Sequence, residues 1–206
     1  MDTDQIIPKQ FLKRIERSGF GQFLFFDWRL NEDGTPNKDF ELNKPGYENS
    51  EILISGRNFG SGSSREHAPW ALLDYGFKCI LAPSFADIFF NNCFQNGILP
   101  ITLPEHLIEK IMSKSQELPG YRLSIDLESQ RIWDEDEEIS TTFEVEPFRR
   151  HLLLNGLDDI GLTLEHEKEM LQSILTLNDT TVEEVFTHRK NICSFNIELD
   201  FKTLIE

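Results

Sequence analysis

A glycine- and serine-rich stretch, residues 56–67, holds the side chains best suited to chemistry. It reads Gly-Arg-Asn-Phe-Gly-Ser-Gly-Ser-Ser-Arg-Glu-His and lies between an expected strand and an expected helix. Glycines let main-chain N–H groups turn toward a ligand, and the start of a helix adds partial positive charge. Ser63 and Ser64 supply hydroxyls, and Arg65 supplies a planar guanidinium that can hold a carboxylate through two hydrogen bonds. The stretch therefore predicts an anion-binding turn.

Three better-known motifs of similar composition do not match this turn. A phosphate-binding P-loop ends in Gly-Lys-Ser/Thr, a dinucleotide fingerprint needs a third glycine, and a nucleophile elbow needs Gly-x-Ser-x-Gly. The turn alone thus indicates only an anion. A purely structural interpretation also stands, in which the turn merely caps a helix, His67 is a core or capping residue, and Arg57 pairs with a nearby carboxylate.

The elements around the turn predict an α/β fold. Residues 51–55 form an apolar strand, residues 65–75 a helix that Gly76 ends, and residues 78–82 a second strand. Strand, helix and strand within about 30 residues make a βαβ unit with parallel strands. The turn then lies at the carboxyl end of a parallel strand, where open α/β sheets bind ligands.

Further elements are expected on both sides of this unit. Helices are predicted over 9–18, from Ser84 as the capping residue to Asn96, from Pro104 to Leu118, over 148–154 and from Leu162 onward. Strands are predicted over 98–102, 121–127, 130–133 and 141–146, the second and third of these as a hairpin. Less regular segments are the strand end or loop at 2–8, the aromatic patch at 23–28, the surface excursion at 31–49 and the acidic, solvated turn at 134–138.

Composition limits the class of protein. The 206 residues, 39% of them hydrophobic, are enough for one to one and a half domains with a sizeable core. The net charge of −16 disfavours nucleic acid and anionic membrane as partners, and no apolar run approaches a membrane span. The first four residues do not resemble a secretory signal, and three scattered cysteines do not form a disulfide or metal framework. We therefore expect a cytoplasmic protein.

Residues 60–68, Gly-Ser-Gly-Ser-Ser-Arg-Glu-His-Ala, resemble the signature of the swivel domain of the aconitase superfamily. The resemblance extends in order from residue 2 to about 168 and is closest to the small subunits of 3-isopropylmalate dehydratase, through residues 2–8, 70–72, 74–76, 85–89 and 155–163. It implies a layered β/β/α swivel domain over 1–168, with a parallel βαβ core and an additional antiparallel hairpin region. An N-terminal strand usual in the family is missing before Asp2, and 169–206 is expected to be an atypical extension, helical at first.

The resemblance also implies a reaction. Members of this family are hydro-lyases that isomerise 2-isopropylmalate and 3-isopropylmalate in leucine biosynthesis, by dehydration and rehydration. The implied enzyme is a heterodimer whose large subunit carries a [4Fe–4S] cluster, so that no cofactor is expected in this chain. Ser63 matches the superfamily's catalytic base, which acts as an alkoxide, and Arg65 matches the residue that holds a substrate carboxylate. Ser64, Gly62 and Asp4 match further substrate-binding positions.

The choice among related hydroxy-diacids stays open at this stage. The family's substrate-discriminating position falls close to Phe11-Leu12-Lys13, and the lysine there does not distinguish between substrates. The aromatic patch at 23–28 is a candidate shelter for an isopropyl group as well as a candidate core segment. Alternatives are a dehydratase of the citraconate/methylmalate or homoaconitate type and a non-catalytic module that binds dicarboxylates.

Overall fold

The computed structural model describes residues 1–157 except 14–17, 48 and 63–64. The predictions for Ser63 and Ser64, for the helix from Leu162 and for a domain boundary near residue 168 lie outside the described residues and stay predictions.

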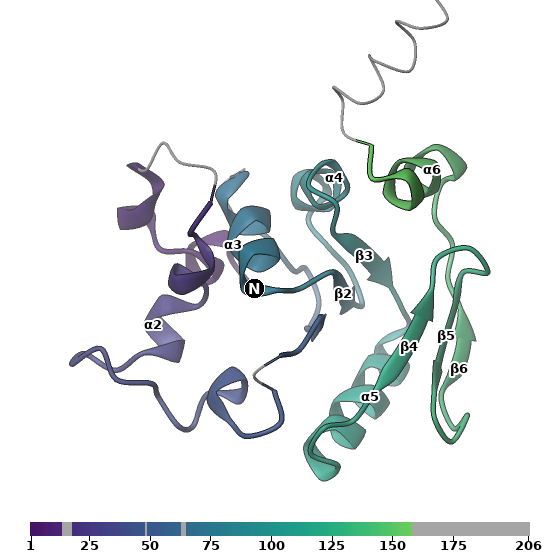
Figure 1. Ribbon diagram of the computed structural model, residues 1–206, viewed down its shortest axis with the longest axis horizontal. Coiled ribbons are helices and arrows are strands. Elements are labelled where there is room, and N and C mark those ends of the chain that lie inside the picture. The colour runs from purple at the N-terminus through teal and green to yellow at the C-terminus, as the bar shows by residue number, and fades with distance from the viewer. Residues whose placement is uncertain (14–17, 48, 63–64, 158–206) are drawn as a thin grey trace, which may run out of the picture. The chain divides into compact units, whose positions relative to one another are not determined.

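A parallel three-stranded sheet forms the centre of the fold (Figure 1). Its strands are β1 (Ile52–Ile54), β2 (Cys79–Ala82) and β3 (Leu99–Thr102), paired in that order. Helix α3 (His67–Tyr75) connects β1 to β2, and α4 (Asp87–Gln95) connects β2 to β3. The predicted βαβ unit is confirmed, and the turn of residues 56–62 leaves the carboxyl end of β1.

A second, antiparallel sheet follows in the chain. Helix α5 (Glu105–Glu117) begins after Pro104, as predicted, and is followed by β4 (Leu123–Asp126), β5 (Arg131–Asp134) and β6 (Ser140–Thr142). The hairpin of β4 and β5 is confirmed, but the strand that follows it, β6, is shorter than the predicted 141–146. Beyond β6, the Phe143 N–H donates to the Gln130 carbonyl and the Val145 N–H donates to the Gln130 side chain, so regular pairing with β5 does not continue. Helix α6 (Pro147–Asn155) completes the described chain.

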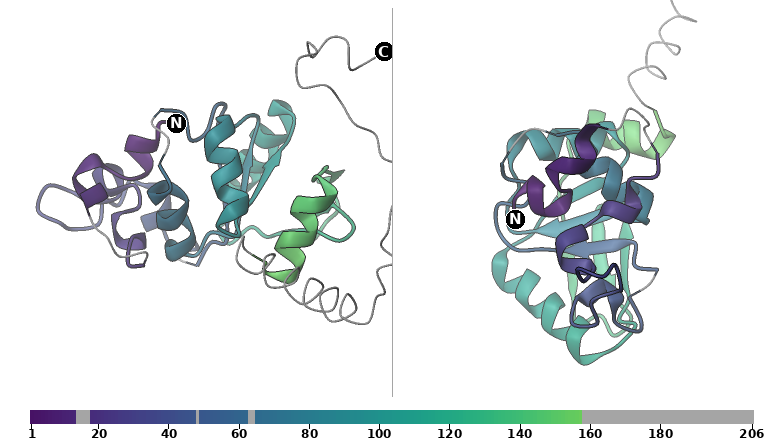
Figure 2. Two further views of the ribbon diagram at one scale, coloured as in Figure 1. Left: turned by 90° about the horizontal axis from the view of Figure 1, so that it is seen from above. Right: turned by 90° about the vertical axis from the view of Figure 1, so that its left-hand side faces the viewer.

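Short helical turns fill the N-terminal part, in purple to blue in Figure 2. They are α1 (Thr3–Ile6), η1 (Lys9–Lys13), η2 (Gly21–Phe23), α2 (Phe26–Arg29) and η3 (Glu41–Asn43), where η marks a 3-10 helix. Two of them, α1 and η2, contact α3. The prediction of a strand end or loop at residues 2–8 was wrong. The Asp2 carboxylate accepts from the Asp4 N–H while Gln5 accepts from the Asp2 N–H, and this capping box starts a helical turn. Within the predicted helix 9–18, residues 9–13 form the 3-10 turn η1, and Ser18 lies in a bend.

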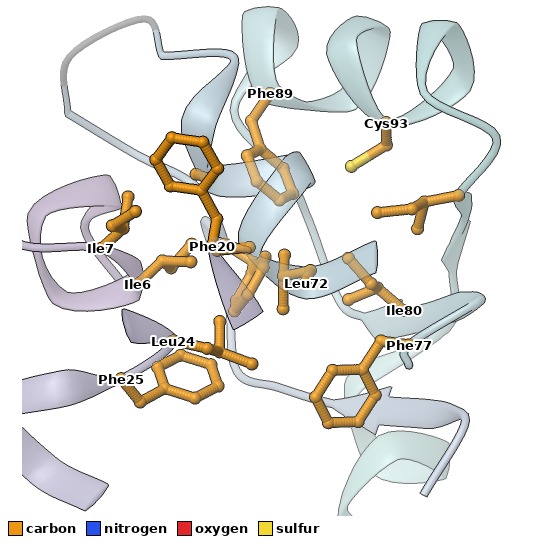
Figure 3. Close-up of a cluster of buried hydrophobic side chains, with 14 of the residues drawn as sticks. Ile6, Ile7, Phe20, Leu24, Phe25, Leu72, Phe77, Ile80, Phe89 and Cys93 are labelled. Carbon is orange, nitrogen blue, oxygen red and sulfur yellow. The ribbon is translucent and has the colours of Figure 1, made fainter. Parts of the chain in front are cut away.

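The two faces of the parallel sheet belong to two hydrophobic clusters. On β2, Ile80 and Ala82 join one cluster while Cys79 and Leu81 join the other, as the alternation of side chains along a strand requires. The first cluster packs the N-terminal turns and α3 on the sheet (Figure 3), and the second packs α5 and the antiparallel sheet on its other face. This layering confirms the predicted fold class.

The turn after β1 packs tightly against α4. Gly60 has a φ of +76°, and a Cβ atom added to it would lie 2.1 Å from Cγ of Phe89, a residue only 3% exposed. Ser84 was predicted to cap α4, which is wrong, because Ala86 holds the capping position. The Ser84 hydroxyl instead accepts a hydrogen bond of 2.8 Å from the N–H of Asn58. Ser84 and Phe89 thus hold the turn in place.

Asp134 departs from the predicted solvated acidic turn. Its side chain is buried and accepts hydrogen bonds from Lys114 Nζ at 2.8 Å, the Tyr121 hydroxyl at 3.0 Å and the N–H of Ile139 at 3.0 Å. Lys114 lies on α5, Tyr121 precedes β4 and Ile139 follows β5, so the residues next to Asp134 in the sequence did not indicate these contacts. Burial by itself raises the pKa of Asp134, but the bonds from Lys114, Ile139 and Tyr121 outweigh it and lower the pKa to about 2.

Replacing Asp134 tests this network. Asp134→Asn should lower the free energy of unfolding by about 2 kcal/mol at pH 7, because it removes the buried charge that accepts three hydrogen bonds, while Lys114 keeps its exposed partner Glu138 at 2.6 Å. Since the folded pKa lies below the unfolded value of about 3.9, the stabilisation is full above pH 4 and is lost as the pH falls toward 2. Urea unfolding between pH 7 and pH 2 should therefore show the free energies of unfolding of the unmodified protein and of Asp134→Asn converging in acid. The control Glu137→Gln, which removes an exposed pair with Arg131, should cost less than about 1 kcal/mol; an equal loss in both variants would contradict this account.

Substitution of Gly60 tests the packing of the turn. Gly60→Ala should cost about 3 kcal/mol, because the added methyl group meets Phe89 and the backbone has a left-handed φ. Gly34→Ala is the matched control, since Gly34 has a similar φ of +81° but open space around its missing Cβ. Thermal unfolding of both variants separates packing from backbone strain. An equal loss of stability in Gly60→Ala and Gly34→Ala would mean that the clash with Phe89 adds nothing to the cost of the methyl group.

Candidate functional site

The turn of residues 56–62 lies between two other segments that fix its path. On one side, the Thr3 N–H donates to the Ser61 carbonyl at 2.7 Å, within a parallel bridge between Asp2 and Ser61. On the other side, the N–H of Ala86 donates to the Phe59 carbonyl at 2.9 Å. Segments far apart in sequence therefore meet at the carboxyl edge of the sheet, where the βαβ pattern predicted a site.

Gly62 is required for the approach of the N-terminal segment. Its φ is +99°, and a Cβ atom added there would lie 2.4 Å from Oδ1 of Asp2. The same Oδ1 accepts the Asp4 N–H at 2.9 Å, so that one carboxylate both starts α1 and lies against the turn. The sequence suggested a substrate-binding role for Gly62; the structure adds that Gly62 makes room for Asp2.

A hollow of about 190 Å³ opens beside the turn. Two of the predicted site residues, Gly62 and Arg65, line it. The rest of its wall is formed by Thr3, Gly60 and the first turn of α4, residues 86–89. The first N–H groups of a helix have no partner within the helix and carry partial positive charge. The hollow therefore combines a guanidinium and a helix start with one acidic residue, Asp87, and the sequence did not indicate that this helix is α4.

Arg65 is held in place by an ion pair with Asp4. Its side chain is 10% exposed, and its Nη1 contacts Oδ1 of Asp4. The second oxygen of Asp4, Oδ2, lies 3.1 Å from Nζ of Lys9. The structure thus brings together two residues that the family resemblance selected and adds a third, Lys9, which sequence reasoning missed. The available signal was a lysine directly after the matched segment 2–8.

The purely structural interpretations hold for two other residues. The His67 ring packs edge-on against Phe20 and lies 4.9 Å from the Trp70 ring, centroid to centroid. Arg57 donates from Nε to Glu105 at 2.6 Å on the surface, and this bond together with the positive charge lowers the pKa of Glu105.

The residues considered for substrate choice do not line this hollow. Phe11 stacks on Phe23 with ring centroids 4.0 Å apart, and Lys13 ends η1 with its side chain exposed. In the aromatic patch, Phe25 is buried in the core. Phe25 and Trp28 line a different, larger hollow of about 560 Å³.

Neither a metal site nor a membrane span is found in the part of the chain that the structure describes. Among these residues no three His, Cys, Asp or Glu side chains lie together as metal ligands would. Burial raises the pKa of both Cys79 and Cys93, which keeps these thiols protonated. Nor is any described helix both long enough and apolar enough to cross a bilayer.

Comparison with known proteins identifies the family. Residues 1–106 match the model of the aconitase C-terminal domain, and residues 109–147 match the LeuD_N model. The 3-isopropylmalate dehydratase small subunit of Brevibacillus brevis is 60% identical over 170 residues, which cover 82% of this chain and 87% of that protein. The small subunit of Bacillus pumilus is 61% identical over 170 residues, 82% of this chain and 84% of the relative.

A solved structure shows the same fold. The crystal structure of 3-isopropylmalate dehydratase from Methanocaldococcus jannaschii superposes with a TM-score of 0.58 at 25% identity, covering 84% of this chain and 90% of that one. Sequence relatives, domain models and fold agree with the resemblance carried by residues 60–68. The chain belongs to the family of 3-isopropylmalate dehydratase small subunits, within the aconitase superfamily.

Proposed function

We propose that this chain supplies the base and the carboxylate clamp of an enzyme that interconverts 2-isopropylmalate and 3-isopropylmalate in leucine biosynthesis. The observation that carries the proposal is the largely buried Arg65 guanidinium, which faces a hollow lined by glycine main chain and by the start of α4. Such a hollow suits a carboxylate, because a guanidinium and free main-chain N–H groups both stabilise negative charge there.

The reaction needs a base next to a bound carboxylate. Dehydration removes a proton from the carbon beside a carboxylate and a hydroxyl from the neighbouring carbon, and rehydration returns the two groups in exchanged positions. In the proposal, Ser63 takes the proton as an alkoxide. A serine alkoxide is unfavourable in water and requires aligned N–H dipoles and a nearby cation. The neighbours Gly62 and Arg65 are suited to supply them, since both line the hollow.

Arg65 is proposed to orient the substrate. A guanidinium has five N–H donors, and the contact with Asp4 is made through Nη1, so Nε and Nη2 are proposed to bind a substrate carboxylate. A carboxylate held by two parallel bonds has a fixed direction, which would keep the proton-bearing carbon near the base. Gly62 and Ser64 are proposed to complete the binding site, with Asp4 holding Arg65 in position.

The remaining chemistry is assigned to a partner. The relatives are named small subunits, which implies a large subunit, and we propose a cytoplasmic heterodimer that is inactive as separate chains. When bound in the large subunit, an iron–sulfur cluster would supply a Lewis acid for the departing hydroxyl. This chain's own contribution would be binding, orientation and proton transfer.

Ser63→Ala tests the base. In the complex with the large subunit, kcat should fall by at least about 10³-fold, within the range that a general base contributes. Assembly should be unchanged by size-exclusion chromatography. Ser124→Ala, an exposed serine on β4, is the control and should retain full activity. A near-normal rate for Ser63→Ala would remove this serine as the base.

Arg65→Lys tests the clamp, because it keeps the charge but loses the planar fork. We expect KM for the diacid to rise at least about tenfold, since hydrogen bonds to charged groups are worth about 1.5–3 kcal/mol. Arg122→Lys, at an exposed position, is the control. Unchanged affinity and rate in Arg65→Lys would contradict the clamp.

The substrate is tested with a panel on the unmodified complex. The proposal predicts the highest kcat/KM for isopropylmalate. A higher value for citraconate, methylmalate or a homoaconitate-type acid would reassign the substrate. Binding of diacids by the chain alone, with no turnover in the complex, would point to a non-catalytic module.

A further inference from the structure

We infer that Lys9 is a positioning residue for the proposed carboxylate clamp, which acts by keeping Asp4 from occupying the whole of Arg65. The inference rests on the proposed role of Arg65 and concerns a residue to which neither the sequence nor the family resemblance gave a part. Its basis is the order of three charged side chains, in which Asp4 lies between two cations.

The two oxygens of Asp4 have different partners. Oδ1 contacts Nη1 of Arg65, and Oδ2 lies 3.1 Å from Nζ of Lys9. A carboxylate with both oxygens free tends to bind a guanidinium through two parallel hydrogen bonds. Because Lys9 binds Oδ2, Asp4 contacts Arg65 through Oδ1 alone. The other donors of the guanidinium are then available to a substrate carboxylate.

The charge balance leads to the same conclusion. Arg65 and Asp4 together carry no net charge, whereas the three residues carry one positive charge. Asp87 also lines the hollow and adds a negative charge, so Lys9 is what brings this group of four residues to neutrality within a chain of net charge −16. Without Lys9, the entering diacid would compete with Asp4 for Arg65 and would meet a net negative charge.

The backbone places Lys9 beside Asp4. Ile6, Ile7 and Pro8 are buried, and they anchor the chain between α1 and η1. The Pro8 carbonyl accepts the Phe11 N–H at 3.1 Å, which starts the turn that Lys9 opens. The lysine side chain is 73% exposed, so it contributes little to the core. A substitution at this position should therefore affect binding rather than folding.

The test is steady-state kinetics of Lys9→Met in the complex with the large subunit. KM for isopropylmalate should rise about fivefold with kcat within about twofold, an effect of the size expected for an exposed charge pair. Lys9→Arg should restore KM. The matched control is Lys44→Met, because Lys44 forms an exposed ion pair with Glu41 at the same distance of 3.1 Å, away from the hollow. An unchanged KM in Lys9→Met would overturn the inference.

A double-mutant cycle shows whether Lys9 acts through Asp4. In an Asp4→Asn background, Lys9→Met should leave KM unchanged, because no carboxylate remains to be drawn away. An equal rise in KM in both backgrounds would mean that Lys9 contacts the substrate directly, and would overturn the inference. The Arg65→Lys result keeps the two proposals separate: if that variant raises KM but Lys9→Met does not, only the role of Lys9 fails.

Discussion

Gly60 and Gly62, in the turn after β1, lie where no side chain fits. A methyl group on Gly60 would overlap Phe89 of α4, and one on Gly62 would overlap the carboxylate of Asp2. This double contact brings α4 and the N-terminal segment to the two sides of one turn. Arg65 and the start of α4 line the same hollow only because the main chain passes between these neighbours without side chains.

The electrostatic design follows from this arrangement. The protein is strongly acidic, yet its candidate site gathers a guanidinium, a lysine and a helix start beside the carboxylates of Asp4 and Asp87. Asp4 lowers the cost of burying Arg65 in the absence of substrate, because an unpaired buried cation is expensive. In the proposed site, Asp4 keeps one end of the guanidinium and the substrate carboxylate binds the remaining donors, so each charge influences the next.

Sequence patterns predicted the elements whose signals are local. Pro104 marked the beginning of α5, Gly76 ended α3, and the alternation after residue 120 marked the hairpin, each through an effect of its immediate neighbours. The turn after β1 was also predicted at the correct edge of the sheet, as its residues 56–62 show. In the aromatic patch at 23–28, which the sequence left open as a core segment or as a shelter for an isopropyl group, Phe25 is a core residue.

Predictions failed where a side chain is satisfied by a distant partner. Ser84 binds the turn after β1 rather than its own helix, and Asp134 is buried against Lys114 on α5 instead of lying in a solvated run. The link between Lys9 and Arg65 through Asp4 likewise depends on how the N-terminal segment packs on the turn. A sequence read residue by residue gives at most the position of such a residue, as for the lysine directly after segment 2–8, and does not identify its partner.

The most direct measurement is a crystal structure of the complex between this chain and its large subunit, with isopropylmalate or an unreactive dicarboxylate analogue bound. The account predicts one carboxylate paired with the Arg65 guanidinium in the hollow beside Gly60 and Gly62, and the Ser63 hydroxyl facing the carbon that loses its proton. A diacid bound elsewhere, with Arg65 still engaged only by Asp4, would contradict it.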